Sequence, residues 1–221
     1  MMIELTIDGV KVKAEKGTTV LEAARSMGIV IPTLCYYPGL STYGECRLCV
    51  VEVMGKKTSL ETSCTMPVEP GLEILTNSPR VKKARKMIVE LLLSTCPSSK
   101  TLQDLASSMG INKVRFKIKE KNCILCGRCV RYCKEQMMAG VIGFIGRGTS
   151  RKVGTAFGVM PPECRNCGGC EWICPVCEQA CNAQKLVNGL CGGCMNLMIV
   201  ETCPVCVKCS EAVGQRGHKT F

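Results

Sequence analysis

The sequence predicts an α+β fold built from several small units in series, and three observations support this prediction. Residues 2–14 alternate between apolar and polar side chains around a tight turn, the middle of the chain has the spacing of a long amphipathic helix, and the second half is rich in cysteine. The 221 residues include 20 cysteines but only four Phe, four Tyr and one Trp, so no large aromatic core is expected. Bound metal is expected to replace part of that core.

The first 78 residues are expected to form a small sheet wrapped by one helix. Residues 2–14 predict a β-hairpin that turns at Asp8-Gly9. Thr18 or Thr19 can cap the helix that follows, and Gly28 can end it. Further strands are expected over residues 50–53, before a turn at Gly55-Lys56, and around Glu73 to Leu75. This is the outline of a β-grasp domain.

Residues 79–112 are expected to form a helical linker. Ser78 and Pro79 suit the N-cap and first turn of a helix that runs to about residue 94. The apolar residues at helical spacing are Val81, Ala84, Met87, Ile88, Leu91 and Leu92. The outer face is expected to carry Arg80, Lys82, Lys83, Arg85 and Lys86. We interpret this basic face as a solvated surface rather than a docking site for an acidic partner.

The next segments are predicted from local signals. Residues 101–109 are expected to form a second, short helix that Gly110 closes, and residues 113–119 have the alternation of a strand. The glycine-rich residues 141–163 are interpreted as a connecting loop. They do not have the G-x-G-x-x-G spacing between a strand and a helix that a dinucleotide site needs.

Two cysteine runs dominate residues 113–180. Both runs have the C-x2-C-x2-C-x3-C spacing of a bacterial two-cluster ferredoxin, in which each run gives three ligands to one 4Fe-4S cluster and a fourth to the other. Zinc is disfavoured because zinc sites rarely use two interleaved four-cysteine runs. The predicted ligand sets are Cys123, Cys126, Cys129 and Cys174 for one cluster, and Cys164, Cys167, Cys170 and Cys133 for the other.

Cysteines also occur upstream and downstream of these runs. The upstream set is Cys35, Cys46, Cys49 and Cys64, whose spacing departs from the plant-type C-x4-C-x2-C pattern. In the tail, residues 181–221, the paired spacing of Cys191, Cys194, Cys203 and Cys206 is compatible with a zinc site or a further 4Fe-4S cluster. Alternatively, Cys203, Cys206 and Cys209 supply three ligands to such a cluster. His218 is the only histidine, which excludes a Rieske centre.

Longer stretches of the chain resemble a known family. Residues 3–93, with IPTLCYYPGL, GECRLCVVEV, SCTMPVEPG and VKKARKMIVELLLS, resemble the N-terminal part of the large iron-sulfur subunit of respiratory complex I. They resemble still more the small iron-sulfur subunit that pairs with the NADH-oxidising flavoprotein in NAD-reducing hydrogenases and related formate dehydrogenases. The resemblance continues through LQDLA and NCILCGRCVRYC to CRNCGGCEWICP, near residue 175. It implies that Cys35, Cys46, Cys49 and Cys64 ligate a 2Fe-2S cluster.

One departure from this family concerns the end of the long helix. The family has a histidine and three cysteines there, which hold an extra 4Fe-4S cluster. This chain has LLLSTCPSSKTLQDLA instead, with Cys96 near the histidine position. We expect that extra cluster to be absent and Cys96 to be a small buried residue.

The resemblance implies a function as an electron-transfer subunit in a hetero-oligomeric oxidoreductase. Its clusters would relay electrons between a flavoprotein that oxidises NAD(P)H and a second redox partner, which is a hydrogenase, a formate dehydrogenase or ferredoxin, with electron bifurcation as one variant. No G-x-S-x-G, H-E-x-x-H or Walker motif indicates a substrate site of the chain's own. The competing hypothesis is a structural or regulatory module that binds nucleic acid or protein.

Charge and hydropathy bear on partners and location. The formal net charge is +11, but each oxidised cluster with four thiolates contributes about −2, so three clusters lower it to about +5. Nucleic acid is therefore not an expected partner. No segment reaches about 18 consecutive apolar residues, and the N-terminus lacks a basic stretch before an apolar run. Neither a membrane span nor a signal peptide is expected, and the predicted location is cytoplasmic.

Overall fold

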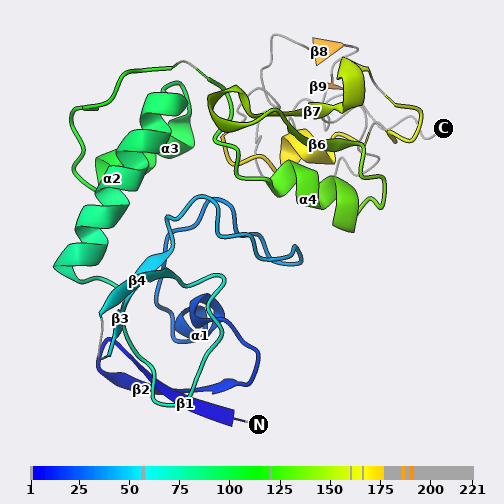
Figure 1. Ribbon diagram of the computed structural model, residues 1–221. Coiled ribbons are helices and arrows are strands. Elements are labelled where there is room, and N and C mark those ends of the chain that lie inside the picture. Colours follow the sequence, from blue (N-terminus) through cyan, green and yellow to red (C-terminus); the bar gives the residue numbers. More distant parts are fainter. Residues whose placement is uncertain are drawn as a thin grey trace, which may run out of the picture. The chain divides into compact units, whose positions relative to one another are not determined.

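The computed structural model describes most of the chain up to residue 176. The described ranges are 2–55, 58–119, 121–159, 161–165 and 167–176, with the backbone of 186–187 and 190–191. The chain divides into two compact units, Met1–Gly127 and Arg128–Phe221 (Figure 1). The domain boundaries predicted near residues 78, 112 and 180 stay predictions.

The first unit begins with a mixed sheet of five strands among the described residues. Its strand order is β2-β1-β5-β3-β4, with β1 and β5 parallel and the other neighbours antiparallel. Asp8 and Gly9 form the turn of the first hairpin with φ of 49° and 82°, which confirms the predicted hairpin. The strands are β1 Met2–Ile7, β2 Val10–Glu15, β3 Val50–Met54, β4 Ser59–Thr62 and β5 Glu73–Leu75.

One helix, α1 (Val20–Ser26), packs against this sheet. Thr19 is its N-cap, and its hydroxyl accepts from the Glu22 backbone N–H while the Glu22 carboxylate accepts from the Thr19 N–H. Gly28 follows the helix with a φ of 78°. The prediction of a threonine cap and a glycine stop is confirmed. The largest fully buried side chains of the sheet and helix are Leu5, Ile7, Leu21, Val20, Val51 and Ile74.

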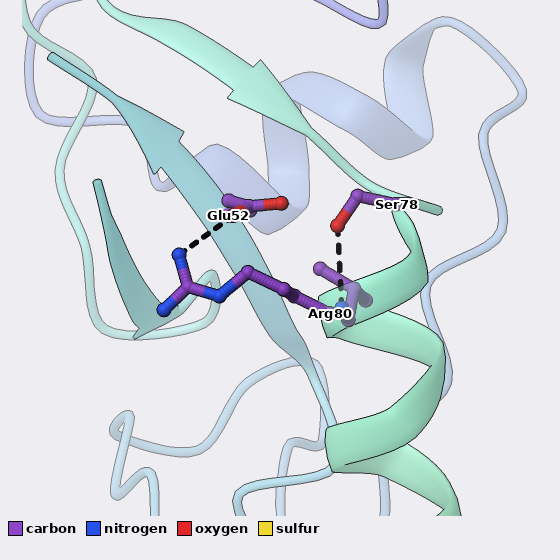
Figure 2. Close-up of polar contacts among 4 residues, drawn as sticks. Glu52, Ser78 and Arg80 are labelled. Atoms are coloured by element: carbon purple, nitrogen blue, oxygen red, sulfur yellow. Dashed lines mark hydrogen bonds and ion pairs between the residues drawn. The ribbon is translucent and has the colours of Figure 1, made fainter.

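The long helix α2 (Pro79–Thr95) is tied to β3 at its N-terminus (Figure 2). The Ser78 hydroxyl accepts from the Val81 N–H at 3.2 Å, and Arg80 donates to the Glu52 carboxylate at 2.8 Å. The Ser78 hydroxyl and the Arg80 guanidinium hold the pKa of the Glu52 carboxyl below its ordinary value. The predicted N-cap is confirmed. The same Ser78 hydroxyl also interacts with Glu52 of β3.

The buried face of α2 differs from the prediction. Arg85, expected on the outer face, is only 7% exposed, whereas Met87 and Leu91, expected on the apolar face, are 38% and 46% exposed. Docking on β3 favours a stripe with i, i+4 spacing, in which Arg85 lies between Val81 and Val89. The long arginine side chain is tolerated there because its guanidinium donates to a backbone carbonyl of β3.

The segment after α2 confirms one prediction and corrects another. The short helix α3 (Lys100–Ser108) contacts α2 and is followed by Gly110 with a φ of 66°. Residues 113–119, expected to form a strand, have no strand pairing. Instead, the N–H groups of Lys119 and Lys121 donate to the carbonyls of Ser94 and Thr95 at 2.8 and 2.7 Å. The segment thus completes the hydrogen bonds of the last turn of α2.

The second unit is small in its described part. The helix α4 (Arg128–Glu135) contacts α5 (Gly169–Trp172) and β6. The glycine-rich segment expected to be a loop contains an antiparallel hairpin, because Ile142, Phe144 and Val153 favour strands while Gly146 and Gly148 supply left-handed turn residues. The remaining elements are β6 Ile142–Ile145, β7 Lys152–Thr155, short 3₁₀ turns at Gly148–Ser150 and Ala156–Gly158, β8 Leu186–Val187 and β9 Leu190–Cys191.

The membrane prediction can be compared with the helices of the described residues. None of them combines the length and apolar character that crossing a bilayer requires.

Removal of the Ser78 hydroxyl tests the N-cap of α2. The Ser78→Ala variant is expected to lower the free energy of unfolding by about 1 kcal/mol, because the Val81 N–H loses its acceptor. Urea unfolding of anaerobically prepared protein, followed by circular dichroism, measures this change. The control is Ser107→Ala at an exposed position of α3, with an expected change within about 0.5 kcal/mol. Equal unfolding midpoints for the two variants would contradict the prediction.

Candidate iron-sulfur site

The pairing of β3 with β4 brings two of the upstream cysteines together. Cys49 immediately precedes β3, Cys64 follows β4, and Val50 is the register partner of Thr62. One position further out, the Ser63 N–H and hydroxyl both donate to the Cys49 carbonyl, at 3.2 and 2.8 Å. The x14 spacing between these cysteines is therefore the length of a hairpin that returns the chain to its starting point.

The other two upstream cysteines join this pair from the loop after α1. The Cys35 N–H lies 3.4 Å from the Cys46 sulfur, within the hydrogen-bond range for sulfur. The Cys35 thiol interacts by hydrogen bonding with both Cys46 and Cys64, and Cys64 in turn with Cys49. All four side chains are buried. The structure thus assembles the whole upstream set in one contiguous group of thiols.

Hydrogen bonding and burial change the pKa values of three of these thiols in opposite directions. Hydrogen bonding with Cys35 and burial raise the pKa of Cys46, and hydrogen bonding with Cys35 and Cys49 raises that of Cys64. Hydrogen bonding from Cys64 lowers the pKa of Cys49 to about 6, against the opposing effect of burial. Thiolates are the metal-ligating form of cysteine, so the group can present ligand charge once its protons are displaced.

The donor set fits a dinuclear cluster. A 2Fe-2S core takes four cysteine thiolates, two on each iron, and requires a dry, soft-ligand environment. The four buried cysteines, linked in pairs through Cys35 and Cys64, supply such soft ligands. Among the residues that the structure describes, no three His, Cys, Asp or Glu side chains are placed to hold a single metal ion.

The C-x2-C loops share a backbone feature. Arg47 and Leu125 have φ of 56° and 57°, and Gly168 has a φ of 68°, so each of these three loops contains a left-handed residue. In the loop that contains Leu125, its N–H donates to the Cys123 sulfur at 3.3 Å. Left-handed non-glycine residues cost free energy and persist where the surroundings require them. In the loop with Leu125, the turn directs this backbone N–H group toward the Cys123 sulfur.

All four cysteines of one predicted 4Fe-4S ligand set lie in the second unit. Cys133 is on α4, Cys170 is on α5, and these two helices contact each other. The approach is close, because a Cβ atom at Gly169 would overlap the ring of Tyr132. Cys164 and Cys167 precede α5 in the same unit. The contact between the helices places α5, which carries Cys170, against α4, which carries Cys133.

The other predicted 4Fe-4S ligand set spans the two units. Cys123 and Cys126 belong to the first unit, Cys129 and Cys174 to the second, and their grouping stays a prediction. Cys96 is buried as expected, and burial, followed by the charge of Cys123, raises its pKa to about 11. Of the tail set, Cys194, Cys203 and Cys206 lie outside the described residues, and Cys191 is described only in its backbone.

Sequence reasoning missed Arg85 as a neighbour of the upstream site. Its guanidinium donates to the Val50 carbonyl, one residue from Cys49. The signal was present in the i, i+4 spacing of Val81, Arg85 and Val89. The neighbouring lysines led to its assignment to the solvated face.

Known proteins are similar to this chain over most of its length. Residues 1–79 match the family described as 2Fe-2S iron-sulfur cluster binding domain. The mitochondrial NADH dehydrogenase iron-sulfur protein 1 of Solanum tuberosum is 39% identical over 181 residues, 70% of this chain and 24% of that protein. The NADP-reducing hydrogenase subunit HndD of Solidesulfovibrio fructosivorans is 35% identical over 206 residues, 79% of this chain and 35% of that protein. The chain thus spans between a quarter and about a third of the length of these relatives.

The match to one solved structure covers a larger share of the related chain. A chain in the crystal structure of an NAD+-reducing NiFe-hydrogenase in the H2-reduced state matches with a TM-score of 0.62 and 30% identity. The match covers 69% of this chain and 74% of that chain. Together with the N-terminal domain match and the assembled thiols, this likeness shows that the chain belongs to the family of iron-sulfur subunits found in NADH dehydrogenase-like complexes and NAD+-reducing hydrogenases.

Proposed function

We propose that this chain relays single electrons through iron-sulfur clusters within a hetero-oligomeric oxidoreductase. One redox partner of the chain is a flavoprotein that reacts with NAD(P)H. The other partner is a hydrogenase, a formate dehydrogenase or ferredoxin. The observation that carries this proposal is the group of four buried thiols in a domain that matches a 2Fe-2S family. The names of the relatives, an NADH dehydrogenase iron-sulfur protein and an NADP-reducing hydrogenase subunit, support the nicotinamide link.

The upstream thiols are assigned to the 2Fe-2S cluster. Such a cluster, when bound, accepts and releases one electron at a potential set by charge, burial and hydrogen bonds to sulfur. The chain contributes the ligands, a water-excluding core beside them and N–H donors directed at sulfur. The proposed ligands are Cys35, Cys46, Cys49 and Cys64.

The two cysteine runs are assigned to two 4Fe-4S clusters in a bacterial-ferredoxin-like domain over residues 113–180. The contact of α4 with α5 supports the interleaved arrangement, because it brings Cys133 of the first run toward Cys170 of the second. The ligand sets are Cys123, Cys126, Cys129 and Cys174, and Cys133, Cys164, Cys167 and Cys170. A tail metal on residues 181–221 would be a zinc or a further cluster.

Reduction by NADH through the flavoprotein tests the electron relay. After reconstitution with its NAD(P)H-oxidising flavoprotein partner, the chain is expected to show cluster bleaching on addition of NADH in an anaerobic stopped-flow experiment. The control is the same mixture without flavoprotein, which is expected to stay oxidised because the chain has no recognised nicotinamide motif. Clusters that remain oxidised in the complete mixture would count against the relay.

Metal analysis tests the ligand assignment. Anaerobically purified protein is expected to contain about ten iron atoms per chain for three clusters, about fourteen with a fourth 4Fe-4S cluster, or about ten with one zinc. Cys49→Ser is expected to remove the 2Fe-2S signal from the EPR spectrum and about two iron atoms.

Cys96→Ser serves as the matched control, since Cys96 is an equally buried cysteine outside the assigned sets. Its iron content is expected to equal that of the wild type. Loss of iron in the Cys96 variant, or full retention in the Cys49 variant, would overturn the assignment.

A glycine substitution tests the packing of the second run on α4. Gly169→Ala is expected to lose most of one 4Fe-4S cluster, about four iron atoms, because the added Cβ overlaps the Tyr132 ring and separates α5 from α4. The double variant Gly169→Ala with Tyr132→Ala is expected to recover iron. The control Gly143→Ala adds a methyl group with no heavy atom within 4 Å. Normal iron content in the single variant would refute this account.

A further inference from the structure

Arg85 is buried beside the proposed 2Fe-2S site. It lies in the middle of the stripe with which α2 contacts β3, and it is 7% exposed. Its terminal nitrogen Nη2 donates to the Val50 carbonyl at 2.7 Å. Val50 directly follows Cys49, so the guanidinium is anchored one residue from a proposed ligand.

The guanidinium has little compensation for its charge. Arginine stays protonated in proteins, and a buried charge is costly unless neighbours pair with it. Among the described residues its Nε has no hydrogen-bond partner, and its recorded acceptor is a neutral carbonyl. Burial lowers the pKa of Arg85, and the two groups that oppose this shift are Cys49 and Asp8.

Asp8 is already engaged in other hydrogen bonds. Its carboxylate accepts from the backbone N–H of Thr76 at 2.7 Å and also from the Thr76 hydroxyl. No hydrogen bond or ion pair joins Asp8 to Arg85 among the described contacts. The proposed cluster ligand next to the carbonyl that holds the guanidinium is Cys49, which directly precedes Val50.

We propose that Arg85 is a positioning residue whose buried positive charge raises the reduction potential of the 2Fe-2S cluster held by Cys49 and its partners. This inference rests on the proposed function. An oxidised 2Fe-2S cluster with four thiolates carries a charge of about −2, and one added electron makes it about −3. A fixed positive charge stabilises the second state more than the first, so reduction becomes easier.

A purely structural role predicts a different result. If Arg85 only fastens α2 to β3, its replacement lowers stability and leaves the potential of the retained cluster unchanged. If its charge acts on the cluster, lysine, which keeps the charge, preserves the potential better than glutamine does. The potential is therefore the measurement that separates the two roles.

The test is an EPR-monitored redox titration of the full chain, purified anaerobically and reduced with dithionite. Arg85→Gln is expected to shift the reduction equilibrium of the 2Fe-2S signal about tenfold toward the oxidised state, which is about 59 mV for one electron. Arg85→Lys is expected to shift it less. The matched control is Lys86→Gln, which removes the same formal charge from an exposed position of α2 and is expected to leave the potential unchanged.

A second variant keeps the inference testable if Arg85→Gln does not retain its cluster. Asp8→Asn removes the negative charge that opposes the pKa shift of Arg85 together with Cys49, suits the left-handed backbone of residue 8, and is expected to raise the potential. An unchanged potential in Arg85→Gln, or in Asp8→Asn where the first variant is lost, overturns the inference. Absence of any 2Fe-2S signal from the wild type would instead refute the proposed function.

Discussion

The antiparallel pairing of β3 with β4 is the interaction on which the N-terminal site depends. The register of this pairing brings Cys64 back toward Cys49. The two hydrogen bonds from Ser63 to the Cys49 carbonyl continue the pairing beyond the last residue of β4. A slip of one residue would turn every side chain of the slipped strand to the opposite face. The aliphatic core between the sheet and α1 opposes such a slip, because Val51 would leave it. The packing of the core therefore also fixes the placement of Cys49 and Cys64.

The helix α2 is attached to β3, the strand that directly follows Cys49. It makes three attachments around one strand: the Ser78 cap next to Glu52, the Arg80–Glu52 ion pair and the Arg85 hydrogen bond to Val50. The ion pair is half in solvent, since Arg80 is largely exposed, and it contributes modestly. The bond from Arg85 is of a different kind, because it places a buried charge at the Val50 carbonyl, one residue from Cys49. Arg85 differs from the neighbouring lysines because its position on the helix buries it, whereas their side chains are exposed.

Features with local causes could be predicted from the sequence, and features that depend on tertiary contacts could not. The turn at Asp8-Gly9 and the caps at Thr19 and Ser78 follow from backbone preferences of a few residues. The burial of Arg85 could not be predicted from polarity, since its acceptor is a carbonyl 35 positions away. The alternating residues 113–119 lack a partner strand and instead bind the end of α2. The upstream ligand set needed family resemblance, because its spacing is set by an intervening hairpin and loop.

The loops that carry the cysteines explain why the cluster and the fold are linked. Arg47 and Leu125 adopt left-handed conformations that cost a β-carbon-bearing residue of order 1 kcal/mol each. Such a cost is sustained only if the surrounding structure compensates it. Hydrogen bonds from N–H to sulfur, such as that from Leu125 to Cys123, strengthen when the sulfur is a metal-bound thiolate. Binding of the proposed clusters would therefore contribute to the folding free energy of these loops, and hydrogen bonds from the same N–H groups to sulfur would influence the reduction potential.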